Sequence, residues 1–146
     1  PGGSILVSDE KNDSVFRFDV DGRLQGHFFK GGVRKREVTR IVVDGERGIY
    51  LLDRKEKMVA ICDVGGGILR TIGPSGLRKP RDVAIDAFRN VYIADEDAGV
   101  LVFDPLGKPF FEITGPEMKK ATAIALDATG AVLVYDDGSD RVLRYR

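Results

Sequence analysis

"NVYIADEDAGVLVFDPLGK", residues 90–108, is the stretch that decides the fold of this chain. It contains two short apolar runs, rich in β-branched and aromatic residues, that end at Asp95 and Asp104. Runs of this kind, bounded by Asp, Gly and Pro, predict β-strands. Between the runs lie three carboxylates, Asp95, Glu96 and Asp97, which can form either a functional cluster or the turn that joins the two strands.

The first apolar run recurs along the chain, which decides between these two interpretations. Its four copies are spaced about 41 to 44 residues apart, at 4–9, 48–53, 90–95 and 131–136. Three further families of apolar runs recur between these copies, so that each unit has four strands. No segment has the pattern of a helix. Units of four short strands that repeat every 40 to 50 residues or so are typical of β-propeller blades. We therefore expect an all-β propeller built of four-stranded antiparallel blades.

The strands and turns agree with this expectation. In "IVV" (41–43) and "VLVF" (100–103) the apolar residues are consecutive, which predicts burial on both faces of a sheet, as in blades that stack face to face. The turns "DVDG" (19–22), "DVGG" (63–66) and "DPLG" (104–107) place Gly three residues after a strand-ending Asp. That spacing is typical of a type I turn closed by a residue in the left-handed conformation.

The run "PRDVAIDAFRNVYIAD" (80–95), followed by "VLVFDPLGK" (100–108), resembles the NHL repeat, although Asp82 stands where that repeat has Gly. The resemblance extends over essentially the whole chain. It implies a six-bladed ring, of which this chain supplies about three and a half blades. With strands labelled a to d outward from the axis, we expect the units 1–38 (strands b, c and d), 39–80, 81–121 and 122–146 (strands a, b and c). We also expect association with further blades or with a second copy, because the terminal strands expose unpaired backbone.

Asp95 belongs to the repeat, because each unit has an aspartate at the same place. Its counterparts are Asp9, Asp53 and Asp136. An aspartate at the end of a strand can accept hydrogen bonds from loop amides, so we interpret all four as structural residues. Glu96 and Asp97 have no consistent counterparts, and their loop does not match the EF-hand pattern. We therefore expect no calcium site and no other metal site.

The overall composition argues against several classes of function. The chain has 23 basic and 23 acidic residues, so no global field draws it to nucleic acid or to an anionic membrane. No apolar run approaches the roughly 18 residues of a membrane span, and the sequence indicates no cellular compartment. A single histidine, His27, argues against a zinc hydrolase or a Ser-His-Asp triad. We expect His27 to be exposed on an outer strand and the single cysteine, Cys62, to lie in the core.

Basic residues recur in the segments that join the outer strand of one unit to the inner strand of the next. We take six of them as candidate binding residues: Arg36, Arg40, Arg78, Arg81, Lys119 and Lys120. In a propeller these segments share one face with the loops between strands b and c, which here are acidic. This face can be a solvated surface with exposed ion pairs, a recognition surface for an acidic or mixed-charge protein segment, or a surface that binds RNA. Interleaved carboxylates would repel phosphates, so we do not expect nucleic acid.

These observations favour a non-catalytic propeller that acts as a scaffold for binding a protein or another ligand, with no cofactor. One alternative is part of a propeller enzyme, lyase-like or lactonase-like, whose metal ligands lie outside this chain. Another is an RNA-binding protein that uses the basic segments. Fold alone does not choose among them, because one fold hosts many functions.

Overall fold

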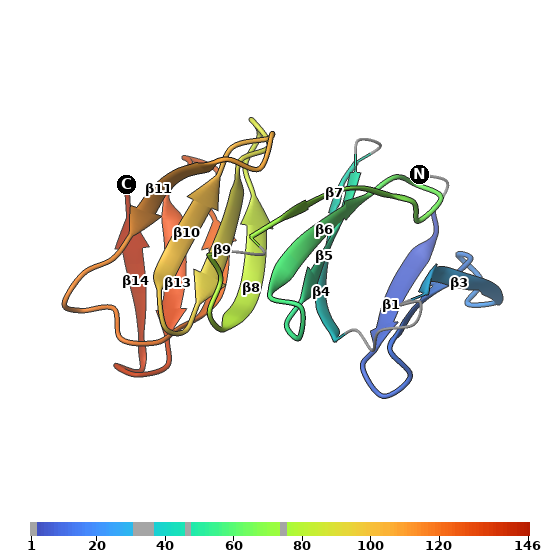
Figure 1. Ribbon diagram of the computed structural model, residues 1–146, viewed down its shortest axis with the longest axis horizontal. Coiled ribbons are helices and arrows are strands. Elements are labelled where there is room, and N and C mark those ends of the chain that lie inside the picture. The colour runs from blue at the N-terminus through green and yellow to red at the C-terminus, as the bar shows by residue number, and fades with distance from the viewer. Residues whose placement is uncertain (1–2, 31–36, 46–47, 74–75) are drawn as a thin grey trace. The chain divides into compact units, whose positions relative to one another are not determined.

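A computed structural model describes residues 3–30, 37–45, 48–73 and 76–146, without the side chains of Phe29 and Lys30. These residues form fourteen β-strands and no helix (Figure 1). Accordingly, this part of the chain has no helix long and apolar enough to cross a membrane. The chain divides into two compact units, 1–71 and 72–146. Each unit is described by itself.

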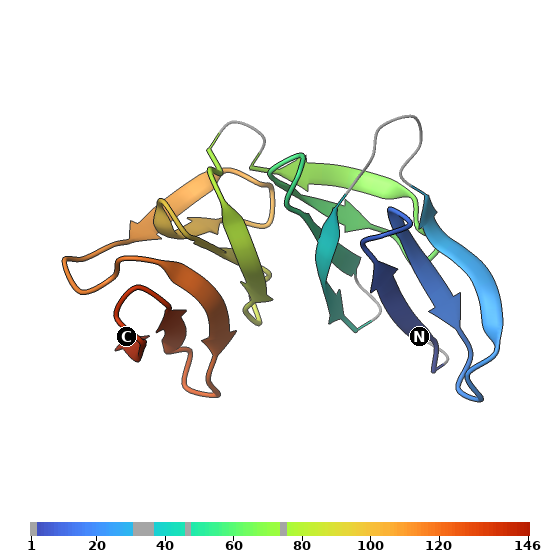
Figure 2. The same ribbon diagram turned by 90° about the horizontal axis from the view of Figure 1, so that it is seen from below.

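The first unit contains two antiparallel sheets. The three-stranded sheet has the order β1-β2-β3, with β1 (Ile5–Asp9), β2 (Ser14–Phe18) and β3 (Leu24–Lys30). The four-stranded sheet has the order β4-β5-β6-β7, with β4 (Val38–Asp44), β5 (Gly48–Asp53), β6 (Met58–Cys62) and β7 (Ile68–Ile72) (Figure 2). A hydrophobic core that includes Val15, Phe28, Leu51 and Cys62 joins the two sheets.

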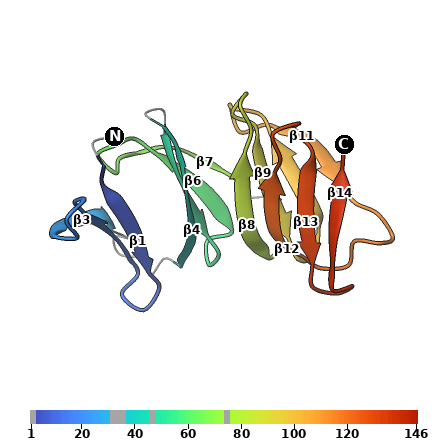
Figure 3. The ribbon, with the colours of Figure 1, turned by 180° about the vertical axis from the view of Figure 1, so that it is seen from behind.

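The second unit repeats this plan in the opposite order. Its four-stranded sheet comprises β8 (Pro80–Ile85), β9 (Val91–Asp95), β10 (Gly99–Phe103) and β11 (Pro109–Ile113). Its three-stranded sheet comprises β12 (Ala121–Leu126), β13 (Val132–Asp136) and β14 (Arg141–Tyr145) (Figure 3). The core between them includes Tyr92, Val102, Ile124 and Val134.

The expected strand content, three, four, four and three strands in successive sheets, is confirmed. Burial on both faces is confirmed for "VLVF" in β10, whose four residues are all buried, and β5 and β9 are also buried throughout. It is wrong for "IVV" in β4, because Ile41 and Val42 are only half-buried and Val43 is exposed. A strand has two buried faces only if its sheet is covered on both sides, and consecutive apolar residues serve that position.

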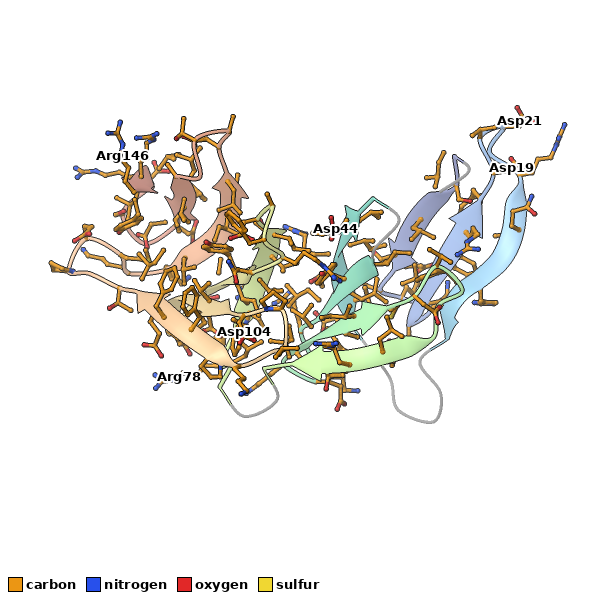
Figure 4. All side chains as sticks on the ribbon, turned by 90° about the horizontal axis from the view of Figure 1, so that it is seen from above. Asp19, Asp21, Asp44, Arg78, Asp104 and Arg146 are labelled. Carbon is orange, nitrogen blue, oxygen red and sulfur yellow. The ribbon has the colours of Figure 1, made fainter. Side chains whose placement is uncertain are left out.

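Aspartates and glycines close the turns as the sequence predicts. Oδ1 of Asp104 accepts hydrogen bonds from the amides of Leu106 and Lys108, both at 2.9 Å, and Gly107 has a φ of 83°. Asp19 follows β2 directly and begins the next turn (Figure 4). Its Oδ1 accepts hydrogen bonds from the amides of Asp21 and Arg23 in the same way. The last two strands of these sheets are therefore connected by short turns with their own hydrogen bonds.

Candidate functional site

The aspartate that ends the second strand of a sheet ties two loops together. In the second unit, the carboxylate of Asp95 is fully buried at the end of β9. Its Oδ2 accepts hydrogen bonds from the amides of Arg78 and Lys79, at 2.7 and 3.0 Å, and its Oδ1 accepts one from the amide of Asp97, at 3.0 Å. One carboxylate thus holds both the segment before β8 and the hairpin after β9.

The same arrangement recurs in the next sheet. Oδ2 of Asp136 accepts from the amides of Lys119 and Lys120, at 2.7 and 2.5 Å, and Oδ1 accepts from the amide of Ser139, at 2.7 Å. Burial on its own would raise the pKa of Asp136, but these hydrogen bonds outweigh it and hold the pKa below its usual range. The carboxylate is therefore kept ionised by the backbone that it organises.

The two equivalent aspartates in the first unit have related partners. Oδ1 of Asp53 accepts from the amides of Glu37 and Glu56, at 3.3 and 2.9 Å. Asp9 accepts hydrogen bonds from the amide and the side chain of Asn12, at 3.1 and 2.7 Å. The side-chain hydrogen bond from Asn12 is the main reason that the pKa of Asp9 is lowered.

The candidate binding residues lie in two different settings. Arg78, Lys119 and Lys120 lie in the segments before β8 and β12, whereas Arg40 and Arg81 lie within β4 and β8. Arg36 lies outside the described residues. In β8 the register shifts between Pro80 and Asp82, so that Arg81 is the extra residue of a β-bulge. A bulge re-aims the side chain at its position, and Arg81 is directed at Glu96.

Most of the basic side chains on this face are engaged by neighbouring acids. Glu96 lies between two cations: it pairs with Arg81, with Nε of Arg81 at 2.6 Å, and with Nζ of Lys120 at 3.3 Å. The hydrogen bond from Arg81 is the largest of the causes that lower the pKa of Glu96. Nζ of Lys79 lies 3.2 Å from Asp97. The acidic residues after β9 therefore neutralise cations of the same face.

Arg78 and Lys119 differ from these neighbours. Their amides bind the buried aspartates, but their exposed side chains form no ion pair with any residue in the described part of the chain. Figure 4 shows Arg78 at the margin of the molecule, with its guanidinium directed away from the sheets. Both residues line a pocket of about 560 Å³ in the second unit, together with Asp97, Thr114 and Met118.

This pocket can bind an anionic group with an apolar neighbour. Two cations whose backbones are fixed stand at its edge, and the Met118 thioether offers a polarisable apolar contact. Among the described residues, no group of three or more His, Cys, Asp and Glu side chains is placed to hold a metal ion. His27 is exposed and its ring lies 4.7 Å from that of Phe16, whereas Cys62 is fully buried, as expected for both.

Two features of the site region were not found by reading the sequence. Asp82 in β8 accepts a hydrogen bond from the amide of Ile124 in β12, which links neighbouring sheets. Arg17 in β2 stands where the repeat has Ile61 and Val102, and its Nε is buried. The second feature could have been noticed as a charged residue where two of the other three copies have an apolar side chain and the last has Arg144.

Comparison with known proteins agrees with the architecture. No protein-family model and no curated protein matches the sequence. A catalytically inactive virginiamycin B lyase from Staphylococcus aureus, crystallised with quinupristin, is similar in structure with a TM-score of 0.83 at 13% identity, over 100% of this chain and 50% of that chain. The nidogen/laminin complex gives 0.82 at 19% identity, over 99% of this chain and 56% of that chain.

A third similar structure is the WD40 β-propeller domain of Doa1, with a TM-score of 0.80 at 16% identity, over 98% of this chain and 46% of that chain. This chain therefore spans about half the length of each of these three structures. At such low identities the similarity shows the fold alone, and it extends to enzymes and to proteins that bind other proteins. Together with the four antiparallel sheets, it shows that the chain is a series of consecutive β-propeller blades.

Proposed function

We propose that this chain is part of a non-catalytic, NHL-type propeller of six blades that binds an acidic or mixed-charge segment of a partner protein. The binding face consists of the segments before β8 and β12 and the hairpins after β9 and β13. The NHL assignment rests on the sequence resemblance, and the kind of partner rests on charge.

One observation carries the proposal. Arg78 and Lys119 occupy equivalent places in successive blades, line the same pocket and have no acidic partner among the described residues, although the cations beside them are paired. The buried carboxylates Asp95 and Asp136 fix the backbone at both positions. A binding surface gains affinity when its groups are held in place before the partner arrives, because less freedom is lost on binding.

The alternatives have less support. A lyase-like or lactonase-like activity would need ligands or catalytic groups near the axis, and the single histidine, His27, lies on the outer strand β3. For RNA, the paired acids Glu96, Asp97 and Asp137 on the same face would repel phosphates. These acids would repel an acidic protein segment at fewer positions than they would repel RNA, because the side chains of the segment can lie between them.

The test is a binding measurement with a defined probe. A fluorescein-labelled peptide that alternates Glu with Leu is titrated with the chain and followed by fluorescence anisotropy, beside a peptide with Lys in place of Glu. The variant Arg78→Glu/Lys119→Glu should bind the acidic peptide at least about tenfold more weakly, and its affinity should depend less on salt. The control Lys108→Glu/Arg146→Glu has the same charge change at residues that do not line this pocket and should bind as the wild type does. Equal loss in both variants, or binding of the basic peptide instead, would refute the proposal.

A further inference from the structure

The first unit contains a cleft that none of the preceding functions uses. It lies where β1 and β2 of one sheet approach β4 and β5 of the next, and β1 and β4 are neighbours in space (Figure 2). Its volume is about 350 Å³. The wall is mainly apolar and comprises Leu6, Ile41, Val43, Ile49 and Val64. Val43 and Val64 are 51% and 46% exposed, so part of this apolar wall faces solvent.

Among the described residues that line this cleft, Arg17 supplies the cationic side chain. Its guanidinium donates a hydrogen bond to the carbonyl oxygen of Val64 and lies 4.9 Å from the centre of the Phe28 ring. These two contacts hold the planar group in place. Its Nε is buried and has no hydrogen-bond partner among the described residues. Buried polar groups almost always have a partner, so the hydrogen bonding of this guanidinium is incomplete within the described part of the chain.

The repeat shows how this cleft differs from the equivalent places in the second unit. In β9 and β10 the places of Leu6 and Arg17 are taken by Tyr92 and Val102, which belong to the core between the two sheets. In β13 and β14 they are taken by Leu133 and Arg144, and Arg144 pairs with Asp127 at 2.8 Å. Arg17 has the same cross-strand neighbour as Arg144 but forms no ion pair with any residue in the described part of the chain.

An acidic residue near Arg17 is engaged by its own turn. Arg17 also borders a polar pocket that contains Asp19. Oδ1 of Asp19 accepts hydrogen bonds from the amides of Asp21 and Arg23, and its Oδ2 accepts one from the side chain of Gln25. Asp19 thus bonds to its own turn and forms no ion pair with Arg17.

We propose that this cleft binds a small amphipathic carboxylate, such as a medium-chain fatty acid. The carboxylate pairs with the planar guanidinium of Arg17, which suits a carboxylate, and the aliphatic tail lies along Ile41, Val43 and Val64. One cation matches a monoanion better than a phosphate with two charges. The volume is at the lower end of the range for ligand sites, roughly 300 to 1,000 Å³, which fits a short chain and not a folded cofactor.

Nuclear magnetic resonance of the whole ¹⁵N-labelled chain tests this directly, because the Nε–H of an arginine gives its own resonance. Octanoate should shift the Nε–H resonance of Arg17 and the amides of Leu6, Ile41 and Val64 in a saturable way. Octanol, which has the same tail without the charge, and acetate, which has the charge without the tail, should each bind at least about tenfold more weakly.

Variants separate this site from general apolar binding. Arg17→Val introduces the residue that stands at this place in β10, so the chain should fold, and octanoate binding should fall about ten- to hundredfold. Arg17→Lys keeps the charge without the planar group and serves if the valine variant does not fold; it should bind several-fold more weakly. Arg23→Val, outside the cleft, should bind as the wild type does.

Three results would overturn the proposal. The first is octanol binding as tightly as octanoate. The second is unchanged octanoate affinity in Arg17→Val or, where that variant does not fold, in Arg17→Lys. The third is tight binding of a peptide with the sequence of β4, VTRIVVD, at the same resonances without competition from octanoate, which would make the cleft a groove for an extended strand.

Discussion

The carboxylate of Asp82 in β8 accepts a hydrogen bond from the backbone amide of Ile124 in β12, at 3.0 Å, although 42 residues separate them in the chain. The other oxygen of Asp82 accepts from the amide of Val83, also at 3.0 Å. One side chain thus joins the inner strands of two neighbouring blades. It stands where the NHL pattern has glycine, and a glycine has no side chain that could make this link.

The first prediction concerns this link. Asp82→Ala should lower the free energy of unfolding by about 1 to 3 kcal/mol, because the amide of Ile124 loses its acceptor in a partly buried place. Asp82→Asn keeps one acceptor oxygen and should cost less than the alanine variant. Urea unfolding followed by circular dichroism measures both. If both variants are as stable as the wild type, the hydrogen bond to Ile124 does not contribute to blade packing.

The second prediction concerns Asp136, which is fully buried and bonded to three amides. Asp136→Asn should cost about 1 to 3 kcal/mol, since the asparagine NH₂ group would face amide donors. The pKa of Asp136 is lowered in the folded chain. Its contribution is therefore present above the unfolded value of 3.8 and is lost as the pH falls below it. The stability of the wild type should fall as the pH drops below about 4, and that of the variant should fall less steeply.

Much of the architecture follows from the sequence, because period, β-branched composition and turn residues all point to the same fold. The role of Asp104 follows from its place three residues before Gly107, and both lie in the expected turn. The ion pairs of Glu96 could not be predicted in the same way. They depend on a bulge that directs Arg81 and on the approach of Lys120 from the next blade, and neither has a signature in one repeat.

The cleft at Arg17 is another feature that could not be predicted from the sequence. The repeat has Ile61, Val102 and Arg144 at the place of Arg17, so it does not show whether the charge of Arg17 is buried, paired or exposed, which depends on the residues around it. Volume in a core is decided by several residues that are far apart in sequence. The expectation that no calcium binds to the loop after β9 stays a prediction, although Glu96 and Asp97 are already paired with cations.

The third prediction uses a repeated left-handed residue. Lys57 and Gly99 occupy the same place in the hairpins after β5 and β9, with φ angles of 51° and 85°. Lys57→Gly should raise the free energy of unfolding by up to about 1 kcal/mol, because strain at Lys57 is relieved and only partly offset by the greater freedom of unfolded glycine. Gly99→Ala should be destabilising, since its Cβ would lie 2.7 Å from the carbonyl oxygen of Ile113. Opposite signs for the two variants in thermal unfolding support this explanation, and equal signs contradict it.

The fourth prediction concerns Glu96, whose pKa is lowered chiefly by its hydrogen bond from Arg81 and further by Lys120. A lowered folded pKa means that this contribution to stability is present above the unfolded value of 4.5 and is lost as the pH falls below it. Glu96→Gln should therefore flatten the pH dependence of stability in this range. The variant also frees Arg81 and Lys120, so it should bind the acidic peptide several-fold more tightly than the wild type. If the variant binds the peptide more tightly but the pH dependence of stability is unchanged, the ion pairs of Glu96 weaken peptide binding without stabilising the fold.

The last prediction concerns alkaline pH. Burial, followed by the hydrogen bond of its hydroxyl to Glu117 at 3.1 Å, raises the pKa of Tyr145 to about 12. The folded chain therefore holds this proton more tightly than the unfolded chain, in which the value is 10.0. The resulting stabilisation is complete below about pH 10 and is lost as the pH rises towards 12. Tyr145→Phe should remove the part of this slope that Tyr145 contributes and leave that of Tyr92 and Tyr135, whose pKa values are also raised. Glu117→Gln should reduce the contribution of Tyr145 while leaving the part that arises from burial. Ultraviolet absorbance gives the ionisation of the tyrosines, and urea unfolding at several pH values gives the slope. A tyrosine that titrates near 10 in the wild type and is absent from Tyr145→Phe would show that Tyr145 does not donate to Glu117 in solution.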